Sequence, residues 1–308
     1  MEERQVRAVA VAIPMKDEAD HAAACLAALD RAAGRHDGPV TLVPFANNCA
    51  DATLAVIRAF KPGHARVEWR AVSLLPPHAH AGCSRRLALD AAAGLLARPS
   101  DVLMATDGDT NVAPDWIART VVHLDAGWGA VAGRALTSRV ERWALPERAR
   151  RRLNRLTQYY LALDWLRAFG RSEEPWPRHW YEGGASMATT LGWYARIGGA
   201  PTPPVAEDRA FFTALKAEGA RVRHAIDVRV ITSARLDGRA PGGMADTLAR
   251  WVEQADDEPI HETYRLNVAL TGEPAGRDAC LTFATLPAEL ARAQRRIRLS
   301  KAGVRAAG

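Results

Sequence analysis

The sequence predicts an α/β protein built on a doubly wound, mostly parallel sheet, and three observations support this fold class. Short apolar runs alternate with helix-like segments along the first 110 residues. The apolar runs contain few polar residues, as at residues 6–13, which is typical of strands buried on both faces. The connections between segments are short, so successive strands with a helix between them are expected to lie parallel under a layer of helices.

Individual residues indicate where several predicted elements of the first half begin, end or face the core. Pro14 ends the first strand, and Leu26 and Leu29 share one face of the helix that follows. Asp51 precedes another helix and is placed to cap it. The elements expected in this half are a strand at 6–13, a helix at 19–33, a strand at 40–45, a helix at 52–60, a strand at 65–72, a helix at 80–97 and a strand at 102–106.

The second half continues the alternation with longer helices. Residues 222–231 alternate polar and apolar side chains like a strand, and residues 235–243 hold three glycines and a proline, as a loop would. The other elements expected are helices at 115–125, 145–169, 191–197, 207–218 and 244–252 and a strand at 130–137. We predict one domain at residues 1–235 with a helical insertion at 139–178, followed by a Gly-rich loop and helical extension at 236–308.

Composition limits the classes of protein that fit. Hydrophobic residues make up 48% of the 308 residues, which is enough for a sizeable core. The four cysteines lie too far apart in sequence for a zinc knuckle and suggest no disulfide framework: Cys25, Cys49, Cys83 and Cys280. The polar start and the lack of a long apolar segment favour a cytoplasmic protein without a signal peptide.

The net charge of +6 is concentrated in two stretches. Residues 139–155 hold seven arginines and two glutamates, and residues 290–308 hold six basic residues and no acidic one. Such runs are most often solvated helix faces, but peripheral contact with the inner face of a membrane stays open. Few aromatic residues interleave with the arginines, so nucleic acid is not an expected partner.

The stretch at residues 103–110 is the strongest candidate for a functional site. Asp107 and Asp109 leave a predicted buried strand one residue apart, so their carboxylates are expected to point the same way. Paired hard oxygens suit a divalent ion that also holds phosphates, such as Mg²⁺ or Mn²⁺. An ordinary turn rich in Asp and Gly is the alternative.

Two other predicted strands also end in polar residues. Lys16, Asp17 and Glu18 follow the first strand, and residues 47–51 follow the second. In open α/β sheets, ligands bind outside the carboxyl ends of the strands. We therefore expect these loops to surround one ligand together with Asp107.

The order of these features resembles the family 2 glycosyltransferases, whose GT-A fold binds nucleotide sugars. The resemblance covers residues 6–233 and depends on several weak motifs in the right order. They are residues 13–18 at the first strand, 48–53 in the second turn, 82–92 on the helix with Arg85, the Asp-x-Asp motif at 106–109, the Gly-rich segment 183–187 and the pair Glu207–Asp208.

The resemblance implies a metal-dependent transfer of a sugar from a nucleoside-diphosphate donor to an acceptor hydroxyl, with inversion. It implies Asp208 as the catalytic base beside Glu207, and two adjacent carboxylates raise each other's pKa. The implied metal ligands, for Mg²⁺ or Mn²⁺, are Asp109, Asp107 and His224. The implied nucleotide-binding residues are Pro14, Lys16, Glu18, Asn48, Asp51, Arg85 and Asp107. The implied acceptor-side residues are Gly183, Gly184 and Trp180.

The second loop departs from the family pattern. Asn47 and Asn48 stand where the family usually has an aspartate for the nucleobase, and an amide both donates and accepts. The base, the sugar and the acceptor therefore stay open. A nucleotidyltransferase is a weaker alternative, because residues 14–18 lack the glycines of its phosphate loop. A non-catalytic nucleotide-sugar-binding module is the other alternative.

Overall fold

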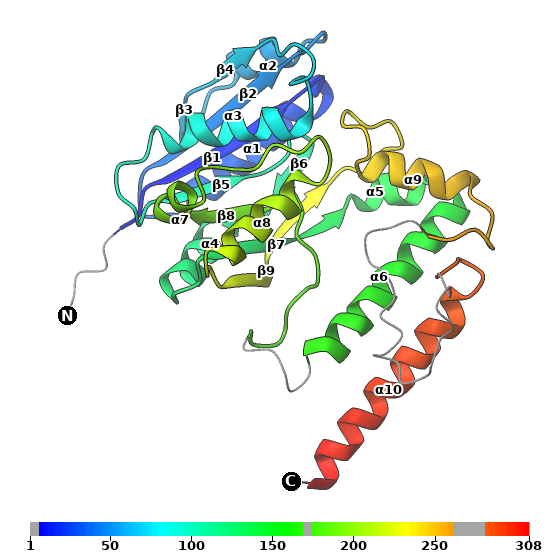
Figure 1. Cartoon of the computed structure of the whole chain (residues 1–308). Helices are drawn as coiled ribbons and strands as arrows, with labels where there is room; N and C mark the ends of the chain where they lie inside the picture. The colour runs from blue at the N-terminus through cyan, green and yellow to red at the C-terminus, as the bar shows by residue number, and fades with distance from the viewer. Residues whose placement is uncertain (1–5, 169–173, 261–280, 308) are drawn as a thin grey trace. The chain divides into compact units, whose positions relative to one another are not determined.

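The computed structural model describes residues 6–168, 174–260 and 281–307 (Figure 1). The chain forms two compact units. The sheet unit contains Met1–Arg139, Tyr181–Ala234 and Gly238–Gly243. The helical unit contains Val140–Trp180, Arg235–Asp237 and Met244–Gly308. Among the helices that the structure describes, none is long and apolar enough to cross a lipid bilayer.

The sheet unit is organised around one nine-stranded sheet in the order β3-β2-β1-β5-β8-β7-β9-β6, with β4 also paired to β2. Strand β8 runs antiparallel to β5 and β7, β6 runs antiparallel to β9, and the other pairs are parallel. The strands are β1 (Val9–Met15), β2 (Val40–Asn47), β3 (Arg66–Val67), β4 (Arg70–Val72), β5 (Val102–Ala105), β6 (Thr110–Val112), β7 (Ala130–Thr137), β8 (Met187–Thr190) and β9 (Val222–Thr232).

Helices cover both faces of this sheet and create two cores (Figure 1). Val11 of β1 belongs to the core with Leu26 and Trp116, whereas its neighbour Ala12 belongs to the core with Leu89 and Phe211. This alternation explains why β1 is apolar throughout. The first core involves α1 (Ala19–Ala33), α2 (Thr53–Ala59) and α4 (Trp116–Asp125), and the second involves α3 (Ala81–Ala93), α7 (Leu191–Arg196) and α8 (Glu207–Ala217).

The predicted fold class is confirmed, with local differences in the elements. The strand expected at 65–72 is divided into β3 and β4, and α3 ends at Ala93, before Gly94. Strands β6 and β8, which are three and four residues long, were not predicted from the sequence. Strands that short give too few alternations for a period to be recognised.

The helical unit consists of α5 (Arg139–Ala144, whose first residue is in the sheet unit), α6 (Glu147–Ala168), α9 (Met244–Glu253) and α10 (Leu286–Ala307). Helix α6 packs against both α9 and α10. Arg152 of α6 is buried, donates to the carbonyl oxygens of Trp251 and Gln254, and pairs with Asp256. The basic run at 139–155 is therefore only partly a solvated face. Most of the predicted insertion and of the predicted extension fall in this one unit.

Candidate active site

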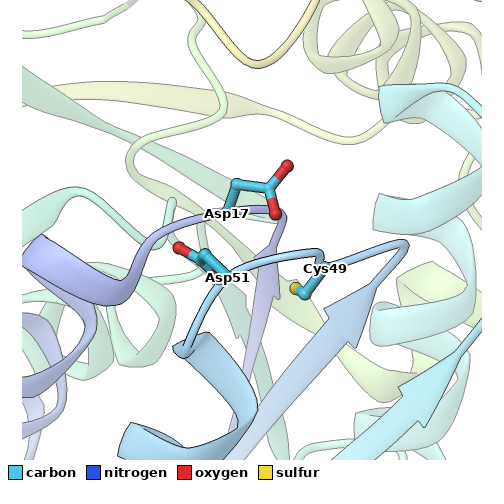
Figure 2. Close-up of side chains that lie close together, drawn as sticks. All are labelled: Asp17, Cys49 and Asp51. Carbon is cyan, nitrogen blue, oxygen red and sulfur yellow. The ribbon is translucent and has the colours of Figure 1, made fainter.

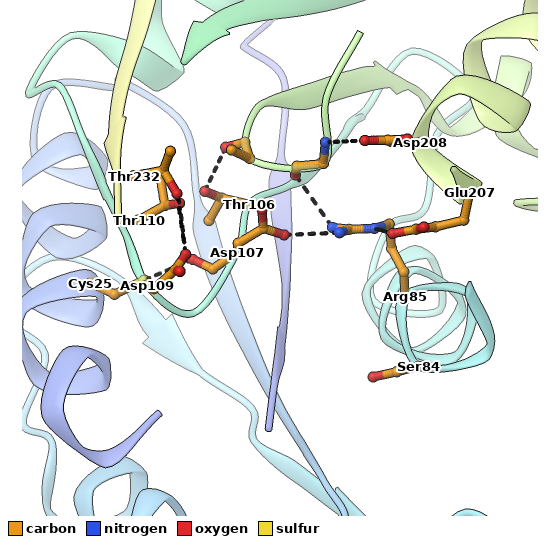
Figure 3. A network of polar contacts seen from close by, with 12 residues as sticks. Cys25, Ser84, Arg85, Thr106, Asp107, Asp109, Thr110, Glu207, Asp208 and Thr232 are labelled. Atoms are coloured by element: carbon orange, nitrogen blue, oxygen red, sulfur yellow. Dashed lines mark hydrogen bonds and ion pairs between the residues drawn. The ribbon is translucent and has the colours of Figure 1, made fainter. Parts of the chain in front are cut away.

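Asp107 and Asp109 lie just beyond the buried strand β5, in the turn before β6 (Figure 3). A Cβ on Gly108 would lie 2.8 Å from the Met15 side chain, so a glycine lets this turn pack on the end of β1. The two carboxylates have different partners. Asp107 Oδ1 accepts from Arg85, and Asp109 Oδ1 accepts from the Thr232 hydroxyl at 3.3 Å.

Arg85 of α3 joins three separate segments of the chain (Figure 3). Its guanidinium donates from Nη2 to Asp107 Oδ1 at 2.9 Å, from Nε to Glu207 Oε1 at 3.0 Å and from Nη1 to the Gly184 carbonyl at 3.3 Å. The side chain is 9% exposed. The turn after β5, the Gly-rich segment before β8 and the start of α8 are thus connected through one buried cation.

Asp208 lies in the first turn of α8, next to Glu207. Asp208 Oδ2 accepts from the Gly184 N–H at 2.9 Å, and Oδ1 accepts from the Arg209 N–H at 2.8 Å. Burial raises the pKa of Asp208, the negative charge of Glu207 raises it further, and the positive charge of Arg85 opposes both. An aspartate with a raised pKa is better suited to accept a proton near neutral pH.

We call Arg85, Asp107, Gly184, Glu207 and Asp208 the site network. The network contains three carboxylates and one cation, Arg85, so it has excess negative charge when the carboxylates are ionised. With Asp109 nearby in sequence, the available ligands are hard oxygens. Hard oxygens with surplus negative charge fit Mg²⁺ or Mn²⁺.

The residues predicted after β1 differ in exposure. Pro14 lies within β1 and pairs with Phe45 of β2, Lys16 is exposed, and Glu18 is buried. The Glu18 N–H donates to the Thr53 hydroxyl at 2.7 Å. This contact fixes the start of α1 against the start of α2, at the same end of the sheet as Asp107.

The loop after β2 is held by its own side chains. Asn48 Nδ2 donates to the Leu74 carbonyl at 2.9 Å, and Asn48 Oδ1 accepts from the Leu74 N–H at 3.0 Å. Asp51 accepts from the N–H groups of Thr53 and Ala19, so it binds the first residue of α2 as well as α1. Much of the hydrogen-bonding capacity of Asn48 is therefore used inside the protein.

Figure 2 shows Asp17, Cys49 and Asp51 together in these two loops. One possible ligand atom from each lies within 4.8 Å of the others. Asp17 Oδ1 accepts from the Ala50 N–H at 2.7 Å, and Cys49 Sγ donates to the Met15 carbonyl at 3.4 Å. These contacts connect the loop after β1 to the loop after β2.

Two predicted site residues belong to other groups of contacts. His224 Nε2 lies 3.1 Å from Glu182 Oε1, and Lys216 also pairs with Glu182. Thr232, the β9 residue that reaches Asp109, lies eight positions further along the strand, so the structure does not group His224 with the two aspartates. Trp180 is in the helical unit, with its ring centroid 4.7 Å from that of Tyr160.

Two contacts of the site were missed from the sequence. Thr232 reaches Asp109 because β9 pairs with β6, and the Thr106 hydroxyl donates to the Ala185 carbonyl at 2.7 Å because β8 pairs with β5. Thr232 lies outside the motifs described above, and the motif at residues 106–109 gives no sign that Thr106 contacts Ala185. Predicting β6 and β8 would have been needed to find them.

No protein-family model matches the chain, and no curated protein matches it. The chain does align with solved structures. TarS 1-349 from S. aureus in complex with UDP aligns with a TM-score of 0.50 and 12% identity, over 94% of this chain and 71% of that one. The mannosyltransferase PcManGT from Pyrobaculum calidifontis in complex with GDP-Man and Mn²⁺ aligns with a TM-score of 0.50 and 17% identity, over 96% and 75%. The chain therefore has the GT-A fold of these glycosyltransferases.

Proposed function

We propose that this chain is a glycosyltransferase that moves a sugar from a nucleoside-diphosphate donor to an acceptor hydroxyl. One observation carries the proposal. The aspartate motif after β5 and the acid pair of α8 meet in one network through Arg85 and Gly184. The contacts between the aspartate motif and the proposed base, at the end of the sheet where α/β proteins bind ligands, support this proposal.

The structural neighbours support the donor class. Of the two described above, one is in complex with UDP and the other with GDP-Man and Mn²⁺. We propose that the donor substrate of this chain is a nucleoside-diphosphate sugar whose base is either uracil or guanine. The side chains around it would come from the end of β1 and from the loops after β1 and β2, with Pro14, Lys16, Glu18, Asn48 and Asp51 as candidates.

The proposed reaction is a direct displacement with inversion. Asp208 accepts the proton of the acceptor hydroxyl, whose oxygen forms a bond to the anomeric carbon. The bond from that carbon to the diphosphate oxygen breaks, and the diphosphate leaves with the electron pair. Asp109 and Asp107 would hold a divalent ion, which supplies positive charge to the leaving diphosphate. Asp208 keeps its orientation through the N–H groups of Gly184 and Arg209.

We also propose that the helical unit makes peripheral contact with the cytoplasmic face of a membrane. Helix α5 buries none of its residues, and Val140 and Trp143 are 81% and 64% exposed beside Arg139 and Arg142. Tryptophan and arginine together suit the interface of an anionic bilayer. Sedimentation with vesicles of neutral or anionic lipid tests this, and equal recovery with both lipids would contradict it.

Turnover tests the proposed function. Release of nucleoside diphosphate from UDP-glucose and GDP-mannose is measured with Mn²⁺, with water replacing the unknown acceptor. We expect release by the wild type from one donor and a loss of about 10²- to 10⁴-fold in Asp208→Asn. A variant that releases nucleotide as fast as the wild type would exclude Asp208 as the base. Binding of a donor without any release would favour a non-catalytic module.

A further inference from the structure

The guanidinium of Arg85 already donates hydrogen bonds to protein groups, unlike that of an arginine whose N–H groups are available to a phosphate. Three of its N–H groups already donate, one each to Asp107, Glu207 and the Gly184 carbonyl (Figure 3). The guanidinium carries five N–H groups in a planar fork, so the three contacts fix both its position and its plane. The side chains of Arg85 and Glu207 are 9% and 11% exposed, so water competes little for this pair.

The positive charge of Arg85 is also already outnumbered by negative charges. Asp107 and Glu207 each form an ion pair with it, and Asp208 adds a third negative charge close enough to stabilise the charged guanidinium. One positive charge therefore faces three negative ones. Without a divalent ion, a diphosphate approaching this group would meet a net negative field, because its attraction to the guanidinium is outweighed by repulsion from the carboxylates. With an ion held by Asp109 and Asp107, that ion and not Arg85 would supply the positive charge that attracts the diphosphate.

We propose, on the premise of the proposed function, that Arg85 is a positioning residue that sets the geometry of Asp208 and is not a ligand of the donor diphosphate. The connection passes through a single peptide group. Arg85 holds the carbonyl of Gly184, and the N–H of the same residue holds Asp208 Oδ2. A shift of the guanidinium would release the Gly184 segment and, with it, one of the two N–H donors that orient the base.

The close approach of Arg85 to Gly184 supports this connection. A Cβ built on Gly184 would lie 2.3 Å from Arg85 Nη2 and 2.7 Å from Cζ, so no side chain fits between them. The charges facing Asp208 are Glu207 on its own helix and Arg85 on α3, with the Gly184 and Arg209 N–H groups on its oxygens. Arg85 is thus the cation that favours the ionised, proton-accepting form of Asp208.

The test compares Arg85→Met, Arg85→Lys and the control Arg86→Met. Arg86 is the next residue on α3, pairs with Asp90 and donates to the Ala200 carbonyl, outside the site network. Calorimetry measures the Kd of UDP and GDP with Mn²⁺, and donor hydrolysis is followed against pH. We expect Arg85→Met to keep nucleotide affinity within about threefold and to lose about 10²-fold in turnover, the loss typical of small misplacements.

The pH profile separates positioning from a purely structural role. Because Arg85 favours ionised Asp208, its removal should move the acid limb of kcat/KM to higher pH. Arg85→Lys should keep the acid limb near its wild-type position, because the charge remains, but should not restore full turnover without the planar fork. Loss of 10²-fold or more in UDP and GDP affinity with an unchanged acid limb would make Arg85 a diphosphate ligand and overturn the proposal.

A third readout needs no donor. Amide hydrogen exchange of residues 183–187 should become faster in Arg85→Met and stay unchanged in Arg86→Met. Unchanged exchange in both variants would overturn the proposal even if turnover falls. If the wild type neither binds nucleotide nor releases it, the proposed function fails, while the exchange result still decides whether Arg85 holds Gly184. Arg85→Lys carries the same measurement if Arg85→Met does not fold.

Discussion

Replacing Gly184 by alanine should damage both stability and activity, and the size of the effect follows from the structure. The new Cβ would lie 2.3 Å from Arg85 Nη2, whereas ordinary contacts begin at 3.4 Å, so the guanidinium must move by about 1.1 Å (3.4 minus 2.3). Its contacts at 2.9, 3.0 and 3.3 Å do not survive such a shift together. Hydrogen bonds to charged groups contribute about 1.5–3 kcal/mol each, and partial rearrangement would leave a net loss of about 3 kcal/mol.

Thermal unfolding and donor hydrolysis measure this effect. A loss of that size should lower the Tm by about 5–10 °C, and displacement of Asp208 should reduce turnover by about 10²-fold. Gly183→Ala is a matched control, because its Cβ would contact only Tyr181 Cδ2, at an ordinary 3.8 Å. Water replaces the acceptor in this assay, so the predicted acceptor-side position of Gly183 does not enter the comparison. Neither glycine has a positive φ, so backbone strain does not distinguish them. Equal Tm and turnover in the two variants would refute the view that Arg85 is fixed.

Three further predictions concern the base, a close contact and a buried carboxylate. Asp208→Asn should keep nucleotide affinity, measured by calorimetry, while turnover falls. Gly82→Ala should lower the Tm markedly, because its Cβ would lie 2.2 Å from the Pro203 carbonyl oxygen, which cannot move aside like a side chain. Asp101→Asn should lose about 2–3 kcal/mol in urea unfolding at pH 7. Burial acts to raise the pKa of Asp101, but backbone N–H groups and the Arg98 guanidinium hold it below its usual value, so the stability difference should shrink as the pH falls through that lowered pKa.

The parts of the fold with strong local signals were predictable. Strands β1 and β2 are long and apolar because both faces are buried, and α1 spans Ala19–Ala33, the range that the sequence predicts. Short strands were not predictable, because β6 and β8 exist only through pairing with β9 and β5. The grouping of residues far apart in sequence into one helical unit was equally hidden, because it depends on packing.

The candidate site also has parts that local sequence signals predict and parts that depend on tertiary packing. Asp107, Asp109, Glu207 and Asp208 could be predicted as candidates because each follows a strand or begins a helix at an expected place. The role of Arg85 could not, since a single helical arginine gives no sign that three distant segments converge on it. Contacts made by backbone atoms, such as the two made by Gly184, leave no signature in the sequence beyond the glycine itself.

Ligand-dependent stabilisation tests the central claim, a nucleoside-diphosphate site that includes a divalent ion at Asp109. The Tm is measured with UDP and with GDP, each with and without Mn²⁺, for the wild type, Asp109→Ala and the control Asp115→Ala, whose carboxylate pairs with Arg119 outside the site network. A nucleotide at 100 times its Kd adds about 2.7 kcal/mol, or about 5–10 °C in Tm. We predict that shift with one nucleotide, dependent on Mn²⁺, kept in Asp115→Ala and lost in Asp109→Ala. A shift that Asp109→Ala retains, or none with either nucleotide, would contradict the account.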